Sequence, residues 1–165
     1  MNFKERLQKV KCFVFDIDGV LTDGKLHILQ DGTMLRNMNI KDGYALRQAY
    51  LKGYFIFVIS GSNAEGVKQR LKNLGIEEVF LNCKDKLDQL NSLLVKHHLT
   101  YEDVLYMGDD LPDMEVMKKC GIATCPNDAV QQIKEISIYI SDKEGGRGAV
   151  RDVIEQTLTL HGNFE

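Results

Sequence analysis

Short apolar runs alternate with helix-like stretches along most of the chain, and this alternation restricts the fold more than any other feature. The strand-like runs are residues 12–15, 55–59, 79–81, 104–107, 122–124 and 138–140, and the helix-like stretches are residues 43–51, 64–74, 86–97, 113–119, 129–135 and 149–161. Because parallel strands are joined by helical crossovers, this order predicts a central parallel sheet flanked by helices. The expected fold class is α/β, a Rossmann-like three-layer sandwich.

Residues 24–39 are the one segment that breaks the alternation. Polar and apolar residues alternate on both sides of Gln30-Asp31-Gly32-Thr33, and Asp-Gly is a strong hairpin turn signal. We expect a β-hairpin that projects beside the exit of the first strand and is too short for a second domain. The chain then forms one domain over residues 1–165, with a hairpin flap at 24–39 and a glycine-rich tail and C-terminal helix at 145–165.

The composition is that of an ordinary soluble globular protein, with 44% hydrophobic and 27% charged residues. A net charge of −3 offers no basic surface for nucleic acid or an anionic membrane. No stretch approaches the roughly 18 apolar residues of a membrane span, and the charged start lacks a secretory signal. We therefore expect a cytoplasmic protein with neither nucleic-acid nor membrane partners.

Acidic residues follow two of the predicted strands. Asp16 and Asp18 come directly after residues 12–15, and Asp109 comes after residues 104–107. The carboxyl ends of strands in an open α/β sheet meet at one crevice, so we expect these carboxylates to lie together. Asp16 is then the candidate nucleophile, which forms an aspartyl-phosphate, and Asp18 is the candidate general acid and base.

Asp109, Asp110 and Asp113 repel one another unless a cation is present, because three carboxylates stand within one short segment. Asp16 and Asp109 are the predicted ligands of Mg²⁺, a hard cation that prefers carboxylate oxygens and retained waters. Asp110 and Asp113 would orient these ligands. An acidic helix N-terminus is the alternative, but it accounts for only one or two of the three carboxylates.

Ser60 and Gly61 follow the apolar run 55–59, where a hydroxyl and backbone N–H groups suit phosphate oxygens, although an ordinary turn is the alternative. Lys86 begins a predicted helix and is the candidate cation for the phosphoryl oxygens. A solvated lysine at a helix start is the alternative, and Lys84 is the rival candidate.

Four motifs occur in a recognisable order: Asp16-Ile17-Asp18-Gly19-Val20, then Ser60, then Lys86, then Gly108-Asp109-Asp110 with Asp113. Together they resemble the haloacid dehalogenase (HAD) superfamily of phosphatases over nearly the full chain. The resemblance implies a HAD-like fold and Mg²⁺-dependent hydrolysis of a phosphomonoester. It also implies that the backbone carbonyl of Asp18 is a further Mg²⁺ ligand.

The absence of a cap-sized insert, the segment Asn39–Tyr44 and the ending Gly145–Arg151 resemble the small capless branch of that superfamily. This branch contains 3-deoxy-D-manno-octulosonate 8-phosphate phosphatases of lipopolysaccharide precursor synthesis and relatives that act on nine-carbon, sialic-acid-like phosphates. The resemblance implies a phosphorylated sugar acid as the substrate and a homotetramer whose neighbouring subunits cover each site. It also implies that Asp42, Gly43 and Tyr44 line the site and that the glycine-rich tail closes over it.

Ser62 departs from this branch, which carries arginine or glutamate after the glycine of the second motif. The identity of the sugar acid therefore stays open between the eight-carbon and nine-carbon classes. Arg70 is the first candidate to bind the substrate carboxylate, and Arg36 and Arg147 are alternatives. Arg70 as an ordinary exposed helix residue is the competing interpretation.

Two other classes of function compete with a phosphatase. A receiver domain phosphorylated on aspartate has a similar length, but its phosphoacceptor ends a central strand downstream of an acidic pair. A catalytically silent, oligomerising relative has no chemical need for the full set of motif residues. The hairpin positions Leu26, Ile28, Met34 and Met38 need an apolar partner, which favours a homotetramer built through the hairpins over a hairpin folded onto its own subunit.

Overall fold

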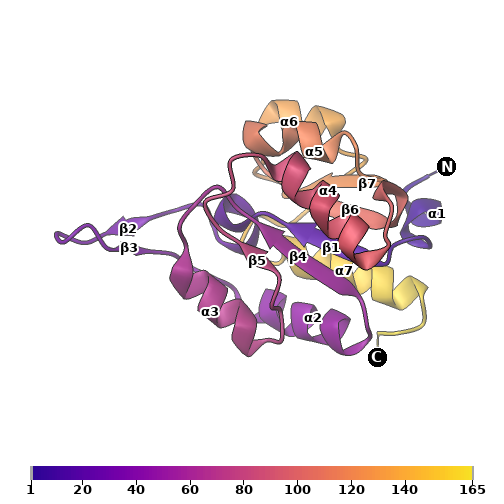
Figure 1. Ribbon diagram of the computed structural model, residues 1–165, viewed down its shortest axis with the longest axis horizontal. Coiled ribbons are helices and arrows are strands. Elements are labelled where there is room, and N and C mark those ends of the chain that lie inside the picture. The colour runs from indigo at the N-terminus through magenta and orange to yellow at the C-terminus, as the bar shows by residue number, and fades with distance from the viewer. Residues whose placement is uncertain (1, 165) are drawn as a thin grey trace.

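The computed structural model describes residues 2–164 and has a six-stranded parallel sheet at its centre (Figure 1). The strands are β1 (Cys12–Phe15), β4 (Phe55–Ile59), β5 (Val79–Phe80), β6 (Val104–Met107), β7 (Ile122–Cys125) and β8 (Tyr139–Ile140), in the spatial order β5-β4-β1-β6-β7-β8. Every neighbouring pair is parallel. The predicted α/β class with a central parallel sheet is confirmed.

Helices cover both faces of this sheet (Figure 1). They are α1 (Phe3–Leu7), α2 (Ile40–Leu51), α3 (Glu65–Asn73), α4 (Lys86–His97), α5 (Met114–Met117), α6 (Gln131–Ile136) and α7 (Ala149–Leu160). One apolar core joins the sheet to α1, α2, α3 and α7, and a second joins its other face to α4, α5 and α6. Strands between two such layers are buried on both sides, which explains their uninterrupted apolar runs.

Two helices differ from the sequence-based expectation. The helix expected from residue 43 begins at Ile40, because the side chain of Asn39 accepts a hydrogen bond from the Lys41 N–H at 2.8 Å and caps the helix there. The short helix α1 was not expected at all. It has a capping box between Asn2 and Glu5, but it is too short for a periodic apolar pattern to reveal it.

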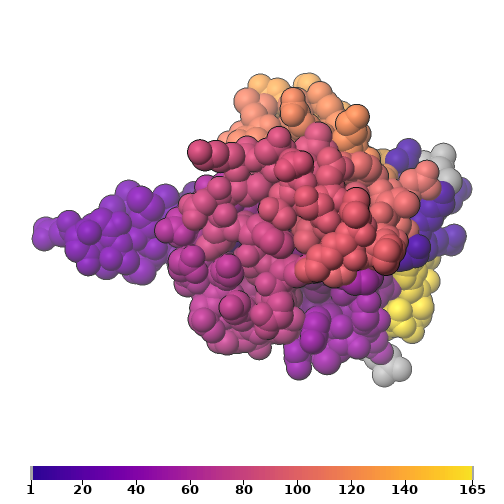
Figure 2. All heavy atoms as spheres, viewed as in Figure 1, coloured from indigo at the N-terminus to yellow at the C-terminus, as the bar shows by residue number. Residues whose placement is uncertain are grey.

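The expected hairpin is present as β2 (His27–Ile28) and β3 (Met34–Leu35), which pair antiparallel. It stands out from the body of the protein as a thin arm (Figures 1 and 2). Ile28 is 66% exposed and Met34 is 52% exposed, so the arm does not fold back over its own subunit. Large apolar side chains in such a position leave an unpartnered apolar surface.

The glycine-rich segment 145–148 packs against the turn after β1 instead of standing free. The Gly146 N–H donates to the carbonyl of Val20 at 2.9 Å, and the Gly145 N–H donates to the Asp128 carboxylate at 3.0 Å. A Cβ at Gly145 would lie 1.8 Å from the carbonyl oxygen of Gly19. Only a residue without a side chain allows this approach.

No helix among residues 2–164 is both long and apolar enough to cross a membrane.

Replacing Gly145 with alanine forces two backbone segments apart, so Gly145→Ala should lower the free energy of unfolding by about 1–3 kcal/mol, the usual range for overpacking. Gly66→Ala is the matched control, because nothing lies within 4 Å of its added Cβ and its place in α3 favours alanine. Urea denaturation measures both. Equal stability of Gly145→Ala and wild type would contradict the packing described above.

Candidate active site

The carboxyl ends of β1 and β6 bring the predicted acidic residues together. Phe15, the last residue of β1, is level with Met107, the last residue of β6. The chain runs from β1 outward to β4 and β5 and then returns to β6, so the strand order reverses beside β1. Such a switch point is where ligands bind in open α/β sheets. Asp16 and Asp109 enter the crevice from its two sides.

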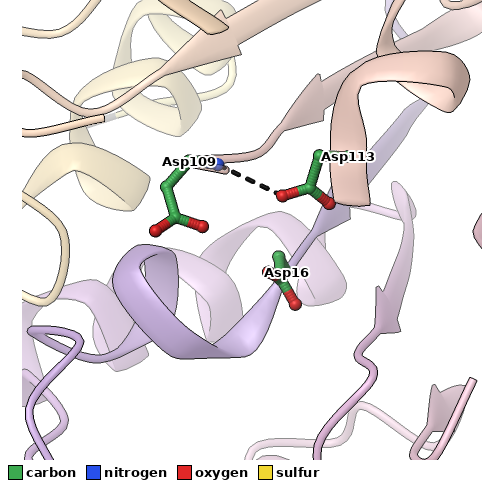
Figure 3. A group of neighbouring side chains, drawn as sticks. All are labelled: Asp16, Asp109 and Asp113. Carbon is green, nitrogen blue, oxygen red and sulfur yellow. Dashed lines mark hydrogen bonds between the residues drawn. The ribbon is translucent and has the colours of Figure 1, made fainter. Parts of the chain in front are cut away.

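The side chains of Asp16, Asp109 and Asp113 form a tight cluster of carboxylates at this point (Figure 3). One oxygen from each side chain lies within 4.8 Å of the others. The Asp109 N–H donates to Asp113 Oδ2 at 3.2 Å, and the Ile17 N–H donates to Asp16 Oδ1 at 2.7 Å. Asp110 is not one of the three: its side chain accepts from the Leu111 N–H at 2.7 Å and caps the short turn before α5.

Two glycines make room for these carboxylates. A Cβ at Gly19 would fall 1.9 Å from Asp109 Oδ2, and a Cβ at Gly108 would fall 2.5 Å from Cβ of Asp113. Gly19 also has φ +82°, a conformation that other residues rarely adopt. The motif glycines are therefore required by close packing of the acidic side chains as well as by the turn.

Lys86 places a positive charge within this cluster of carboxylates. Its side chain is 6% exposed, and Nζ lies 3.1 Å from Asp16 Oδ1 and 2.7 Å from Asp113 Oδ1. Burial lowers the pKa of Lys86, but the charges of Asp16 and Asp113 outweigh burial and raise it above its ordinary value. The structure thus places Lys86 beside the candidate nucleophile, and the rival Lys84 stays exposed on the cleft wall.

The single ammonium of Lys86 does not balance the negative charge of three carboxylates. The pKa values of Asp16 and Asp109 are accordingly raised. Burial, and then the charge of Asp113, raise the pKa of Asp16 from 3.8 to about 7 against the opposing effect of Lys86. Burial, and then the charge of Asp16, raise the pKa of Asp109 from 3.8 to about 8. A hard divalent cation removes this repulsion, so Asp16 and Asp109 fit such an ion and its carboxylate preference.

A cleft of about 430 Å³ opens beside the carboxylates and takes in Asp18, Ser60, Gly61 and Ser62 in addition to Asp16, Lys86, Asp109 and Asp110. Ser60 is buried, and its Oγ lies 3.0 Å from Ser62 Oγ and accepts from the Ser62 N–H at 3.2 Å. A larger cavity of about 590 Å³ lies near the starts of β1 and β4, at the other end of the sheet, and contains none of the predicted site residues.

Asp18 makes its side-chain contacts with the hairpin. Arg36, directly after β3, donates from Nε to Asp18 Oδ1 at 2.7 Å and from Nη2 to Asp18 Oδ2 at 3.4 Å. Arg36 was an alternative candidate for binding a substrate carboxylate, but its guanidinium pairs with the Asp18 carboxylate of its own chain.

The remaining predicted substrate residues do not line the cleft. Asp42 is buried and accepts from the Gly148 N–H at 3.3 Å and the Arg151 N–H at 2.9 Å, so its carboxylate caps the start of α7. Gly43 and Arg70 are neighbours, since a Cβ at Gly43 would lie 3.1 Å from Arg70 Nη2. Arg70 lines a separate groove between the hairpin and α3.

Tyr44 and Arg147 also lie outside the cleft. Half of the Tyr44 surface is exposed, and the Arg151 guanidinium lies 5.6 Å from its ring centroid. Arg147 is exposed and pairs with Glu144 at 3.4 Å. A site confined to one subunit therefore contains the phosphate-binding chemistry but few groups that face the rest of a substrate.

Tyr106 is the site residue that sequence analysis missed. It is fully buried in β6, and its hydroxyl donates to Asp113 Oδ1 at 2.8 Å, beside the Lys86 contact. The hydroxyl of a buried tyrosine needs a polar partner. A tyrosine in an otherwise apolar strand could therefore have indicated a buried polar contact at Tyr106.

No family model matches the chain. A 3-deoxy-D-manno-octulosonate 8-phosphate phosphatase KdsC of Salmonella typhi is 33% identical over 160 residues, which cover 97% of this chain and 85% of that protein. A KdsC of Yersinia pestis is 31% identical over 161 residues, which cover 98% of this chain and 86% of that protein. The aligned regions therefore span nearly the whole of this chain.

Solved structures share the fold closely. The probable YrbI family phosphatase of Pseudomonas syringae pv. phaseolica has a TM-score of 0.94 and 38% identity and covers 97% of this chain and 91% of its own. The 3-deoxy-D-manno-octulosonate 8-phosphate phosphatase of Moraxella catarrhalis, in complex with a magnesium ion, a phosphate ion and a KDO molecule, has a TM-score of 0.94 and 32% identity and covers 98% of this chain and 92% of its own.

The raised pKa values of Asp16 and Asp109 predict how stability depends on pH without metal. The folded protein keeps these protons above the pH at which the unfolded chain releases them, so their stabilisation is complete below about pH 4 and is lost as pH rises through 7 to 8. The loss should be on the order of 2–4 kcal/mol, seen as a falling Tm in a chelator.

Magnesium should oppose this loss, and raise Tm more at pH 8 than at pH 5, because protons compete for the same oxygens. Asp109→Asn removes one raised pKa and should flatten the pH dependence. Equal stabilisation by Mg²⁺ at both pH values would contradict the assignment of the carboxylates.

Proposed function

The chain belongs to the 3-deoxy-D-manno-octulosonate 8-phosphate phosphatase (KdsC) family, in the capless branch of the HAD superfamily, and on that basis we propose that it hydrolyses the 8-phosphate ester of this sugar acid. The observation that carries the proposal is Lys86 held between Asp16 and Asp113 beside a cleft that also contains Asp18 and Ser60. Each group needed for phosphoryl transfer to an aspartate stands at one end of the sheet.

Asp16 is the proposed nucleophile. One of its carboxylate oxygens forms a bond to phosphorus as the bond from phosphorus to the sugar oxygen breaks, which leaves a phosphoryl group on Asp16. Lys86 touches the Asp16 carboxylate and offers positive charge to the phosphoryl oxygens, and the Ser60 hydroxyl and the Gly61 N–H lie at the cleft for the same oxygens.

Asp18 is the proposed general acid and base. It gives a proton to the departing sugar oxygen, and then takes a proton from the water whose oxygen attacks phosphorus and restores the Asp16 carboxylate. Magnesium is the proposed cofactor, held by Asp16, Asp109 and the Asp18 carbonyl, and when bound it neutralises charge between carboxylate and phosphate. The cluster of Asp16, Asp109 and Asp113 supports magnesium as the cofactor.

The eight-carbon substrate is favoured over the nine-carbon alternative by the names of the relatives. The Moraxella catarrhalis relative was crystallised with the eight-carbon sugar acid KDO together with magnesium and phosphate. Ser62 stays the position at which a difference in preference would arise, because it lies at the cleft beside Ser60.

The purified protein with Mg²⁺ should release phosphate from the eight-carbon 8-phosphate at a higher kcat/KM than from a nine-carbon keto-acid 9-phosphate. Asp16→Asn should abolish turnover with an unchanged circular dichroism spectrum, because an amide cannot attack phosphorus. Activity after exhaustive chelation, or near-wild-type turnover by Asp16→Asn, would refute the mechanism. A preference for the nine-carbon ester would refute only the choice of substrate.

We propose that the protein is a homotetramer built through its hairpins. The exposed apolar residues of the arm need a cover, and a cleft with few groups for the sugar acid needs surface from a neighbour. The expected cytoplasmic location stays a prediction.

Light scattering coupled to size exclusion should give a mass near four chains for the wild-type protein. Ile28→Glu with Met34→Glu should shift the mass toward one chain and lower kcat/KM, because charge on the arm opposes burial. Lys25→Glu is the control on the same hairpin and should leave the assembly intact. An active wild-type species of one-chain mass would reject the shared site.

A further inference from the structure

Arg36 is the residue through which the hairpin reaches the cleft. Its neighbours Met34 and Leu35 are about half exposed, but the Arg36 side chain is only 10% exposed and turns back to Asp18. Two guanidinium nitrogens face the two carboxylate oxygens of Asp18. A planar fork of this kind fixes the orientation of a carboxylate as well as its position.

Asp18 has one side-chain partner, whereas Asp16 and Asp113 each have two or more. Asp16 is held by the Ile17 N–H and Lys86, and Asp113 by Lys86, Tyr106 and the Asp109 N–H. Within residues 2–164, Arg36 is the only group that donates to the Asp18 side chain, which is 37% exposed. Without Arg36, Asp18 would be free to take other rotamers in water.

We propose that Arg36 is a positioning residue that aims the Asp18 carboxyl group at the leaving oxygen, and thereby links the placement of the hairpin to the rate of phosphoryl transfer. This inference rests on the proposed function. Proton transfer requires the two heavy atoms at hydrogen-bond distance, and a small displacement of the acid costs a large factor in rate.

The hairpin is well suited to transmit such an effect. Its base is tied near the active-site turn by the Thr22–Met38 bridge and by Asn37 Nδ2, which donates to Asp23 Oδ2 at 3.2 Å. Arg36 also lines the groove of about 500 Å³ between the hairpin and α3, next to Met34 and Leu35. A contact that moves the arm in this groove moves the guanidinium that holds Asp18.

Leaving-group dependence separates this role from a structural one. Aryl phosphates with acidic phenols need little protonation as they depart, whereas phenyl phosphate needs more. If Arg36 aims Asp18, Arg36→Gln should lower kcat/KM for phenyl phosphate by about 10- to 100-fold and for para-nitrophenyl phosphate by only about threefold or less. Arg36→Lys keeps the positive charge but only one donating nitrogen and should recover part of the difference, and Lys25→Gln is the hairpin control.

Neither ester carries a carboxylate, so a role of Arg36 in binding the sugar acid predicts no loss with either ester. Loss of hairpin structure predicts equal losses with both. Either result would overturn the proposal. A wild-type protein that hydrolyses neither ester nor the 8-phosphate with Mg²⁺ would instead reject the proposed function, and this inference with it.

A double-mutant cycle tests whether the effect passes through Asp18. In an Asp18→Asn background, Arg36→Gln should change kcat/KM for phenyl phosphate by less than about twofold, because the group it positions is already gone. Folding is checked by circular dichroism and the mass of the assembly. Full additivity of the two substitutions would contradict the proposed route.

Discussion

The contact of Lys86 with Asp16 and Asp113 is the interaction on which the site depends. It is buried, so each charge has lost water and is stabilised only by its partners. Removal of Lys86 would leave Asp16 and Asp113 buried without the cation that pairs with both of them. The lysine still neutralises only part of the acidic group, and burial together with the remaining negative charge raises the pKa values of Asp16 and Asp109. The mutual repulsion of these carboxylates also favours the binding of a cation between them.

The parallel sheet makes this concentration of charge possible. Buried strands β1 and β6 end level with one another, and their apolar side chains anchor the backbone immediately before each acidic residue. Lys86 arrives from the first turn of α4, which is fixed by its own apolar face against the sheet. The candidate catalytic groups from distant parts of the sequence are thus held by rigid elements, and the glycines at 19 and 108 let them approach.

The sequence was sufficient to predict the positions that follow from strand ends, because Asp16, Ser60 and Asp109 come just after the ends of parallel strands, and these ends lie at one edge of the sheet. It was insufficient where a side chain finds a partner far along the chain. Asp42 looked like a site residue, yet its carboxylate caps α7, and nothing local distinguishes a distant cap from a ligand. The Arg36 contact with Asp18 was missed for the same reason. The glycine-rich segment was expected above the site, but its small residues serve backbone packing.

That packing joins the beginning of the sequence to its end. The turn that carries Asp16 and Asp18 emerges early in synthesis, but the Gly146 N–H that binds its Val20 carbonyl is made after every strand of the sheet. In a nascent chain this turn lacks that support until residues 145–148 have been added, and closure of so long a loop comes late in folding. Support for the turn that follows β1 therefore depends on a segment that is far away in the sequence and is synthesised after the whole sheet.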